Sequence, residues 1–182
     1  MPKIINVAEF LPPSAGAADM AEFTRARRNP MLNWDDMAFI KKTWGGPMLI
    51  KGVLTAEDTR LALDNGADGV VVSNHGGRQL DGVPGSLRAL PEVLAAVNGQ
   101  IEVLVDGGVR RGSDIVKALC LGARAVLIGR SYGWALGAAG GPGVDRAIDI
   151  LRTDVIRTMR LLGCASVSSL DGSYLDNGKR DL

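Results

Sequence analysis

From residue 47 to residue 162 the sequence repeats one pattern: a short apolar run, a glycine-containing loop and an amphipathic stretch. The apolar runs occupy residues 48–51, 69–73, 102–106 and 125–128. They are rich in Val, Leu and Ile without polar alternation, which is typical of parallel strands covered on both faces. Amphipathic stretches at 56–65, 86–97 and 113–121 predict helices between them. The sequence therefore predicts an α/β protein with a parallel sheet.

Local signals mark the ends of these helices. Thr55 and Ser113 are expected helix starts, and Gly66 and Gly122 are expected left-handed residues after helix ends. A last helix is predicted over residues 143–162, where apolar residues recur close to every 3.6 positions. No strand is expected before residue 47, and Asn33 is predicted to cap a helix that ends at residue 44.

Two architectures satisfy alternating strands and helices, namely a doubly wound sheet and a (β/α)8 barrel. Polar residues follow all four strands, at Lys51, 73–78, 106–110 and 129–130. A barrel brings all these strand ends to one face, whereas an open sheet concentrates function at one switch point. The barrel is therefore favoured. A closed barrel takes about 250 residues, so four units in 182 residues predict half a barrel. It is a fragment, the product of a truncated reading frame, or a subunit completed by another chain.

Charge and cysteine content exclude some classes of protein. Lys and Arg number 21 and Asp and Glu 20, which argues against a general nucleic-acid or membrane footprint. The local basic run at residues 25–28 is interpreted as solvated surface rather than an anion patch. No apolar segment approaches the ~20 residues that span a bilayer. Cys120 and Cys164 lack metal-ligand spacing, so no metal is expected, and both are expected to be reduced and buried in a cytosolic protein.

Two glycine-containing loops suggest a phosphate site. The segment VDGGVRRG places Asp106 at a strand end with Gly107 and Gly108 beside it, and LIGR does the same for Gly129 and Arg130. In barrels the loops after the last two strands commonly bind phosphate. Either motif alone is better explained as an ordinary tight turn. The two in succession favour phosphate binding.

Two side chains point to a small organic acid as substrate. His75, the only histidine, follows a buried strand, and Arg78 lies three residues further on. Imidazole suits general-base work near neutral pH, and a guanidinium can grip a carboxylate with two hydrogen bonds. A lone histidine is more often structural, but this setting favours function. Lys51, as a cation at the barrel mouth, is expected to meet an anion or electron-rich ligand rather than to be a snorkelling surface lysine.

The segments SNHGGRQLDG and VDGGVRRGSDIVKALCLGARAVLIGR resemble the signature of the FMN-dependent α-hydroxy acid dehydrogenases and oxidases. IKGVLTAEDTRLAL and LPEVLAAV fit the same family. The resemblance implies the carboxyl-terminal half, strands five to eight, of a (β/α)8 barrel. It implies a half-barrel that binds FMN over residues 29–171, a variable and mobile loop or helix over 1–28, and a flexible tail over 172–182.

The resemblance also implies roles for individual residues. His75 would be the active-site base and also contact the substrate, whose carboxylate Arg78 would bind. Lys51 would lie by the N1–C2 carbonyl edge of the flavin, Ser73 would contact the flavin, and Asp106 would bind the ribityl hydroxyls. The expected phosphate-binding residues are Gly107, Gly108, Arg110, Gly129 and Arg130.

The implied reaction is oxidation of an L-2-hydroxy acid, of the lactate, glycolate or mandelate class, to the 2-oxo acid. The electron acceptor would be oxygen, a quinone or a cytochrome. The alternative is a truncated, non-catalytic half-barrel with residual FMN or phosphate binding. No nucleic-acid partner is expected, and the location is expected to be cytoplasmic, with a membrane-peripheral one as the alternative. The family's first four strands supply tyrosines, a second arginine and an aspartate that cannot be located here, so self-association or a complementary amino-terminal half is expected.

Overall fold

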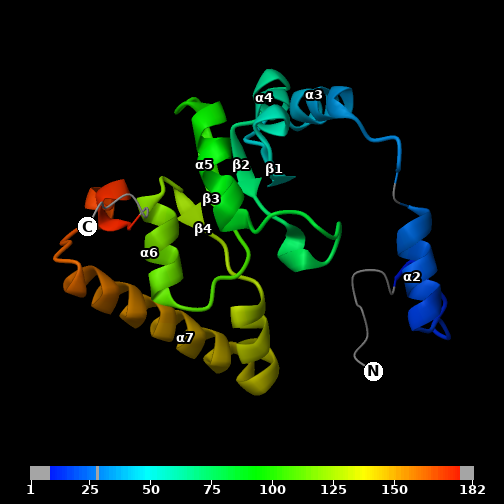
Figure 1. Ribbon diagram of the computed structural model, residues 1–182. Coiled ribbons are helices and arrows are strands. Elements are labelled where there is room, and N and C mark those ends of the chain that lie inside the picture. The colour runs from blue at the N-terminus through cyan, green and yellow to red at the C-terminus, as the bar shows by residue number, and fades with distance from the viewer. Residues whose placement is uncertain (1–8, 28, 177–182) are drawn as a thin grey trace.

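The computed structural model describes residues 9–27 and 29–176, so parts of the predicted variable segment (1–8 and 28) and tail (177–182) lie outside it. Four strands form one parallel sheet in the order β1-β2-β3-β4 (Figure 1). This confirms the predicted number and order of strands. The strands are β1 (Leu49–Val53), β2 (Gly69–Val72), β3 (Glu102–Val105) and β4 (Ala125–Val126). The last is two residues shorter than predicted.

Helices connect successive strands and pack on the sheet. α4 (Ala56–Asp64) contacts β1, α5 (Ser86–Val97) contacts β2 and β3, and α6 (Gly112–Cys120) contacts β4. Right-handed crossovers that always move to the next strand place their helices on the same face of a sheet. The sheet therefore carries one layer of helices and keeps its strand ends accessible on one edge. Two further helices, α2 (Ala17–Ala26) and α3 (Trp34–Trp44), precede the sheet.

The predicted helix boundaries follow from their caps. The Thr55 side chain accepts a hydrogen bond from the Asp58 amide, and the Asn33 side chain accepts from the amides of Asp35 and Asp36. Gly66 and Gly122 have positive φ angles of 80° and 111°, as expected after helix ends. α6 begins at Gly112, one residue before the predicted start.

The main core lies between the sheet and α5. Val70 and Val72 of β2 and Leu90 and Val93 of α5 have no measurable exposure. β1 differs from the prediction of strands buried on both faces, because Leu49 keeps 49% of its surface exposed. β1 pairs only with β2 among the described strands, so its outer edge and part of its inner face meet solvent.

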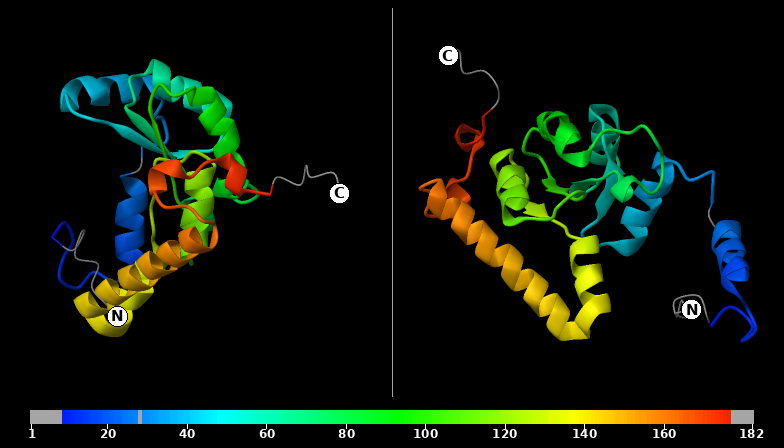
Figure 2. Two further views of the ribbon diagram at one scale, coloured as in Figure 1. Left: turned by 90° about the vertical axis from the view of Figure 1, so that its left-hand side faces the viewer. Right: turned by 60° about the horizontal axis from the view of Figure 1, so that its bottom comes forward.

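The prediction for the last helix was wrong at its start. α7 runs over Arg130–Leu161, thirteen residues earlier than the predicted residue 143. It bends where Ala139 and Gly140 leave helical geometry, with Gly140 at φ 63° (Figure 2). Glycines and Pro142 in this stretch disfavour a helix, yet the chain forms two helical arms joined by a kink.

A second core joins α6 to α7. Cys120, Met159 and Cys164 are buried here, and both cysteines are free, as predicted. Burial raises the pKa of the Cys120 thiol. Tyr174 and Leu175 pack against this second core. The segment predicted as a flexible tail therefore begins with residues that are packed against the protein.

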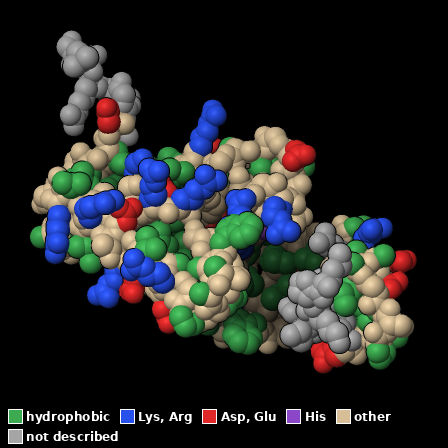
Figure 3. Space-filling model, turned by 90° about the horizontal axis from the view of Figure 1, so that it is seen from below, with side chains coloured by type: hydrophobic (Ala, Val, Ile, Leu, Met, Phe, Trp, Pro, Cys, Tyr) green, Lys and Arg blue, Asp and Glu red, His purple; other side chains and the backbone are tan. Residues whose placement is uncertain are grey.

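The described surface is partly apolar. Seen from below, hydrophobic side chains gather around a hollow near the middle of the molecule (Figure 3). Exposed large apolar residues include Trp44 at 66% and Trp134 at 76%. Among the described residues, no helix is long and apolar enough to span a bilayer.

Candidate functional site

The loop after β2 carries His75 in an uncommon backbone conformation. His75, Gly76 and Gly77 all have positive φ, at 56°, 69° and 71°. Glycine adopts this region freely, whereas a residue with a Cβ atom does so rarely. The His75 amide donates to Ser73 Oγ at 3.1 Å, and the Gly76 amide donates to Asn74 Oδ1 at 3.1 Å. The paired glycines thus let the chain turn sharply and present His75 at the strand end.

A charged network joins the middle of β1 to the ends of β2 and β3. Lys51 Nζ donates to Ser73 Oγ at 2.9 Å and pairs with Asp106 Oδ2 at 2.9 Å. The lysine is therefore directed at the site, as predicted, and the anion that it meets belongs to the protein. Asp106 Oδ1 is buried and accepts no hydrogen bond from the described residues. A buried carboxylate oxygen without a donor is costly, so this atom is suited to receive one from a ligand.

Gly52 makes room for the imidazole. The pairing of β1 with β2 is irregular between Lys51 and Val53, and Gly52 has a φ of 108°. A Cβ atom at Gly52 would lie 2.8 Å from His75 Nε2. The histidine ring therefore rests on the backbone of β1, next to Lys51. Sequence-predicted residues from three different strands, Lys51, Ser73, His75 and Asp106, meet at one edge.

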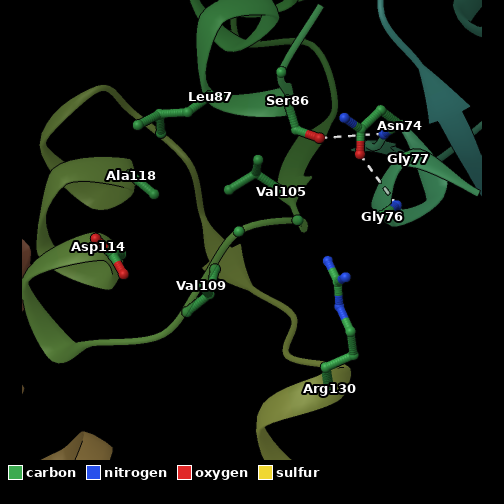
Figure 4. A pocket seen from close by; sticks show the side chains of 13 residues that line it. Asn74, Gly76, Gly77, Ser86, Leu87, Val105, Val109, Asp114, Ala118 and Arg130 are labelled. Carbon is green, nitrogen blue, oxygen red and sulfur yellow. Dashed lines mark hydrogen bonds between the residues drawn. The ribbon is translucent and has the colours of Figure 1, made fainter. Parts of the chain in front are cut away.

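A cavity of about 410 Å³ opens beside these residues, between the loops that follow β2 and β3 (Figure 4). Arg130, at the start of α7, points into it, and its Nη2 lies 3.7 Å from where a Cβ at Gly76 would be. Glycine backbone and a guanidinium together favour an anion such as phosphate. The lining residues are Asn74, Gly76, Gly77, Gly85, Ser86, Leu87, Val105, Gly107, Gly108, Val109, Asp114, Ala118 and Arg130.

Three predicted site residues belong neither to this lining nor to the cluster of Lys51, Ser73, His75 and Asp106. Arg78 is exposed just past the His75 loop. Gly129 directly precedes α7. Arg110 is exposed, and its amide donates to Asp114 Oδ2 at 3.0 Å rather than into the cavity. The structure therefore groups Gly107, Gly108 and Arg130 at the cavity and places Arg110 in the turn that leads into α6.

Sequence reasoning missed the residues that hold the loops. Asn74 and Ser86 join the loop after β2 to the start of α5, and Asp114 accepts from the amides of Arg110 and Arg111. Asp154 of α7 accepts from the Gly112 amide at 2.7 Å. Local spacing could suggest Asp114, which lies in the first turn of α6. Asp154 is 42 residues away from its partner, so no sequence pattern indicates it.

Asp154 fixes α7 against the start of α6. A Cβ at Gly112 would lie 2.2 Å from the Val155 amide nitrogen, so the two helices touch through backbone. The hydrogen bond from the Gly112 amide, followed by the nearby Arg157 guanidinium, lowers the pKa of Asp154. The ionised carboxylate is thereby favoured at the amino end of α6.

Asp154→Asn is expected to lower the thermal midpoint by roughly 2–4 °C at neutral pH. Because the folded-state pKa is depressed, the contribution is present above the usual carboxyl range and is lost as pH falls through the folded value. The gap between wild type and variant should therefore close in acid. Thermal unfolding from pH 7 to pH 3 measures this, with the exposed Asp149→Asn on the same helix as control. A gap that stays constant over this range would contradict the role of the carboxylate charge.

Comparison with known proteins identifies the family. The model of a family described as FMN-dependent dehydrogenase matches residues 5–177. An L-lactate dehydrogenase of Caulobacter vibrioides is 48% identical over 170 residues, which are 93% of this chain and 44% of that protein. A pre-mycofactocin synthase of Mycobacterium tuberculosis is 52% identical over 141 residues, 78% of this chain and 36% of that protein. The chain thus spans less than half the length of these relatives.

A solved structure gives the same result. The monotopic membrane protein (S)-mandelate dehydrogenase aligns with a TM-score of 0.87 and 39% identity, over 97% of this chain and 46% of that one. The four strands and their helices therefore form half of a (β/α)8 barrel, as predicted. With the sequence match, the structural match and the strand-end cluster in agreement, the chain belongs to the FMN-dependent dehydrogenase family.

Proposed function

We propose that this protein oxidises an L-2-hydroxy acid to the 2-oxo acid with FMN, within a barrel in which further strands complete the sheet. The observation that carries the proposal is the cluster of Lys51 in β1 with Ser73, His75 and Asp106, which follow the ends of β2 and β3. It combines a base, a cation and a buried acceptor beside an anion-suited cavity. Family membership supports FMN as the cofactor.

The described residues fit FMN. Asp106 Oδ1, a buried acceptor without a donor, suits a ribityl hydroxyl. Gly107, Gly108 and Arg130 line the cavity and suit a phosphate. A Cβ at Gly107 would lie 3.0 Å from Ser86 Oγ, so glycine keeps this wall of the cavity thin. Arg110 and Gly129 would support the loop around the phosphate rather than line the cavity.

When bound, FMN accepts the two electrons that leave the substrate. Two hydrogens leave the substrate with these electrons. The His75 imidazole would take one as a proton, either from the hydroxyl group while the α-hydrogen leaves with the electrons, or from the α-carbon while the hydroxyl proton is lost separately. The Arg78 guanidinium holds the substrate carboxylate through two parallel hydrogen bonds. The Lys51 ammonium, oriented by its 2.9 Å hydrogen bond to Ser73, would stabilise negative charge on the bound flavin.

Anaerobic titration tests the reaction. The purified protein, completed with the missing strands and loaded with FMN, is expected to bleach with one of L-lactate, glycolate or mandelate. Re-oxidation by oxygen, a quinone or a cytochrome then identifies the acceptor. The name of one relative, pre-mycofactocin synthase, does not refer to a 2-hydroxy acid. The rates of flavin reduction by the three acids must therefore be measured side by side. A yellow protein that none of the acids reduces would contradict 2-hydroxy acid oxidation, and a colourless one would support the non-catalytic alternative.

We also propose that the sheet is completed in trans, by a second copy or by a chain that supplies the other strands. Within the described residues, β1 and β4 each pair on one side only. Unpaired strand edges present rows of donors and acceptors that favour pairing with another chain. A complementary chain suits both edges at once, because the matched relatives contain more than twice the length matched here.

A further inference from the structure

The left-handed backbone of His75 needs support from its surroundings. Its φ of 56° is disfavoured for a residue with a Cβ atom, and such conformations persist only where neighbouring contacts fix them. Ser73 Oγ, which is itself held by Lys51, accepts from the His75 amide. This contact fixes the entry to the turn, and the rest of the turn depends on Asn74.

Asn74 is held by Ser86. Asn74 Oδ1 accepts a hydrogen bond from the Gly76 amide. The backbone amide of Asn74 donates to Ser86 Oγ at 3.2 Å (Figure 4). Ser86 is 4% exposed and is the first residue of α5. A serine at this end of a helix usually caps it. Here Gly85 is the cap residue and makes no side-chain cap bond. The Ser86 hydroxyl instead serves the loop after β2.

The same hydroxyl touches the loop after β3. A Cβ at Gly107 would lie 3.0 Å from Ser86 Oγ and 3.4 Å from Asn74 Oδ1. The Gly107 backbone therefore packs directly on the two polar groups that shape the His75 turn. Ser86 lies where the loop of the proposed base meets the loop of the proposed phosphate site, and it contacts both.

We propose that Ser86 is a positioning residue, whose buried hydroxyl acts through Asn74 to fix the His75 loop against the Gly107 loop. The inference rests on the proposed function for its consequence, because the distance between these loops sets how the base faces the flavin. That Ser86 holds the two loops together follows from the described contacts alone.

Hydrogen exchange and NMR without added flavin test this, on a completed barrel in which only the 182-residue chain carries the label. In Ser86→Ala the Asn74 amide loses its acceptor and is expected to exchange roughly tenfold faster. The chain has one histidine, so a histidine-labelled sample gives a single imidazole signal, which is expected to shift or split. Ser86→Thr keeps the hydroxyl and should restore both readouts. Thr55→Ala removes a comparable hydroxyl acceptor at the start of α4 and should leave both unchanged.

Two further results keep the proposal open to refutation. Gly107→Ala pushes on Ser86 Oγ from the other loop and should also move the His75 signal, even if Ser86→Ala does not fold. Unchanged Asn74 exchange and an unchanged imidazole signal in a folded Ser86→Ala would overturn the proposal, as would a His75 signal that ignores Gly107→Ala. Failure of the protein to bind FMN would instead overturn the proposed function, and it would leave the exchange result standing.

Discussion

His75→Gln in the FMN-loaded, completed barrel is expected to slow flavin reduction by the 2-hydroxy acid roughly 10²- to 10⁴-fold, with FMN still bound. Glutamine has a similar reach and retains polar atoms, but it cannot take up the substrate proton. The cavity that suits phosphate is lined by Gly76, Gly107 and Arg130, among others, and not by the imidazole. Reduction and cofactor retention should therefore separate in this variant.

Stopped-flow absorbance of the oxidised flavin measures the first quantity, and flavin fluorescence after filtration measures the second. Lys117→Gln, an exposed substitution on α6, serves as the matched control and should match wild type in both. A normal reduction rate in His75→Gln would remove the histidine from its proposed role. Loss of FMN together with loss of reduction would indicate that His75 supports the cofactor site.

The 182-residue chain studied alone is expected to dimerise, aggregate or bind a hydrophobic dye rather than behave as a compact monomer. The unpaired edges of β1 and β4 and the exposed side chains of Leu49 and Trp134 provide the reason. Co-expression with the part of the Caulobacter vibrioides L-lactate dehydrogenase that this chain does not match should suppress dye binding and increase FMN retention.

Sedimentation equilibrium and dye fluorescence measure this outcome. Leu49→Lys places a charge on the edge strand and should reduce self-association severalfold, since charged residues on edges oppose strand pairing. Leu161→Lys changes an 83% exposed leucine at the end of α7 and should have little effect. A dye-negative monomer with cooperative unfolding would show that the edges are covered within the chain.

The strand–helix units could be predicted because their signals are local. Val70–Val72 form an apolar run long enough only for a strand, and Gly66 and Gly122 mark helix ends through a conformation that other residues rarely adopt. The first arm of α7 could not be predicted in this way. Its glycines lower helix propensity, and its contacts are with distant residues, such as the hydrogen bond that Ser131 Oγ donates to the Val109 carbonyl at 2.8 Å.

The site residues likewise separate into those with local sequence signals and those without. His75 and Lys51 were predicted from their places at strand ends, and the structure packs the His75 ring on Gly52, the residue that follows Lys51. Ser86 and Asp154 were missed because each acts on a distant segment, through Asn74 and Gly112 respectively. Side chains that face a ligand carry a chemical signature in sequence. Side chains that hold a loop in place are recognised by their contacts, which are visible only in the three-dimensional structure.

The sequential strand order also sets how the site is assembled as the chain folds. Each strand pairs with the next one along the chain, so every pairing closes a loop of one helix and its turns, which is a small entropic cost. β2 and β3 can therefore dock early around α5. β4 adds only Leu104↔Ala125 and Val105↔Val126, fewer pairs than join the other neighbouring strands. Arg130 follows four residues after β4, so the proposed phosphate site depends on the shortest strand pairing of the sheet.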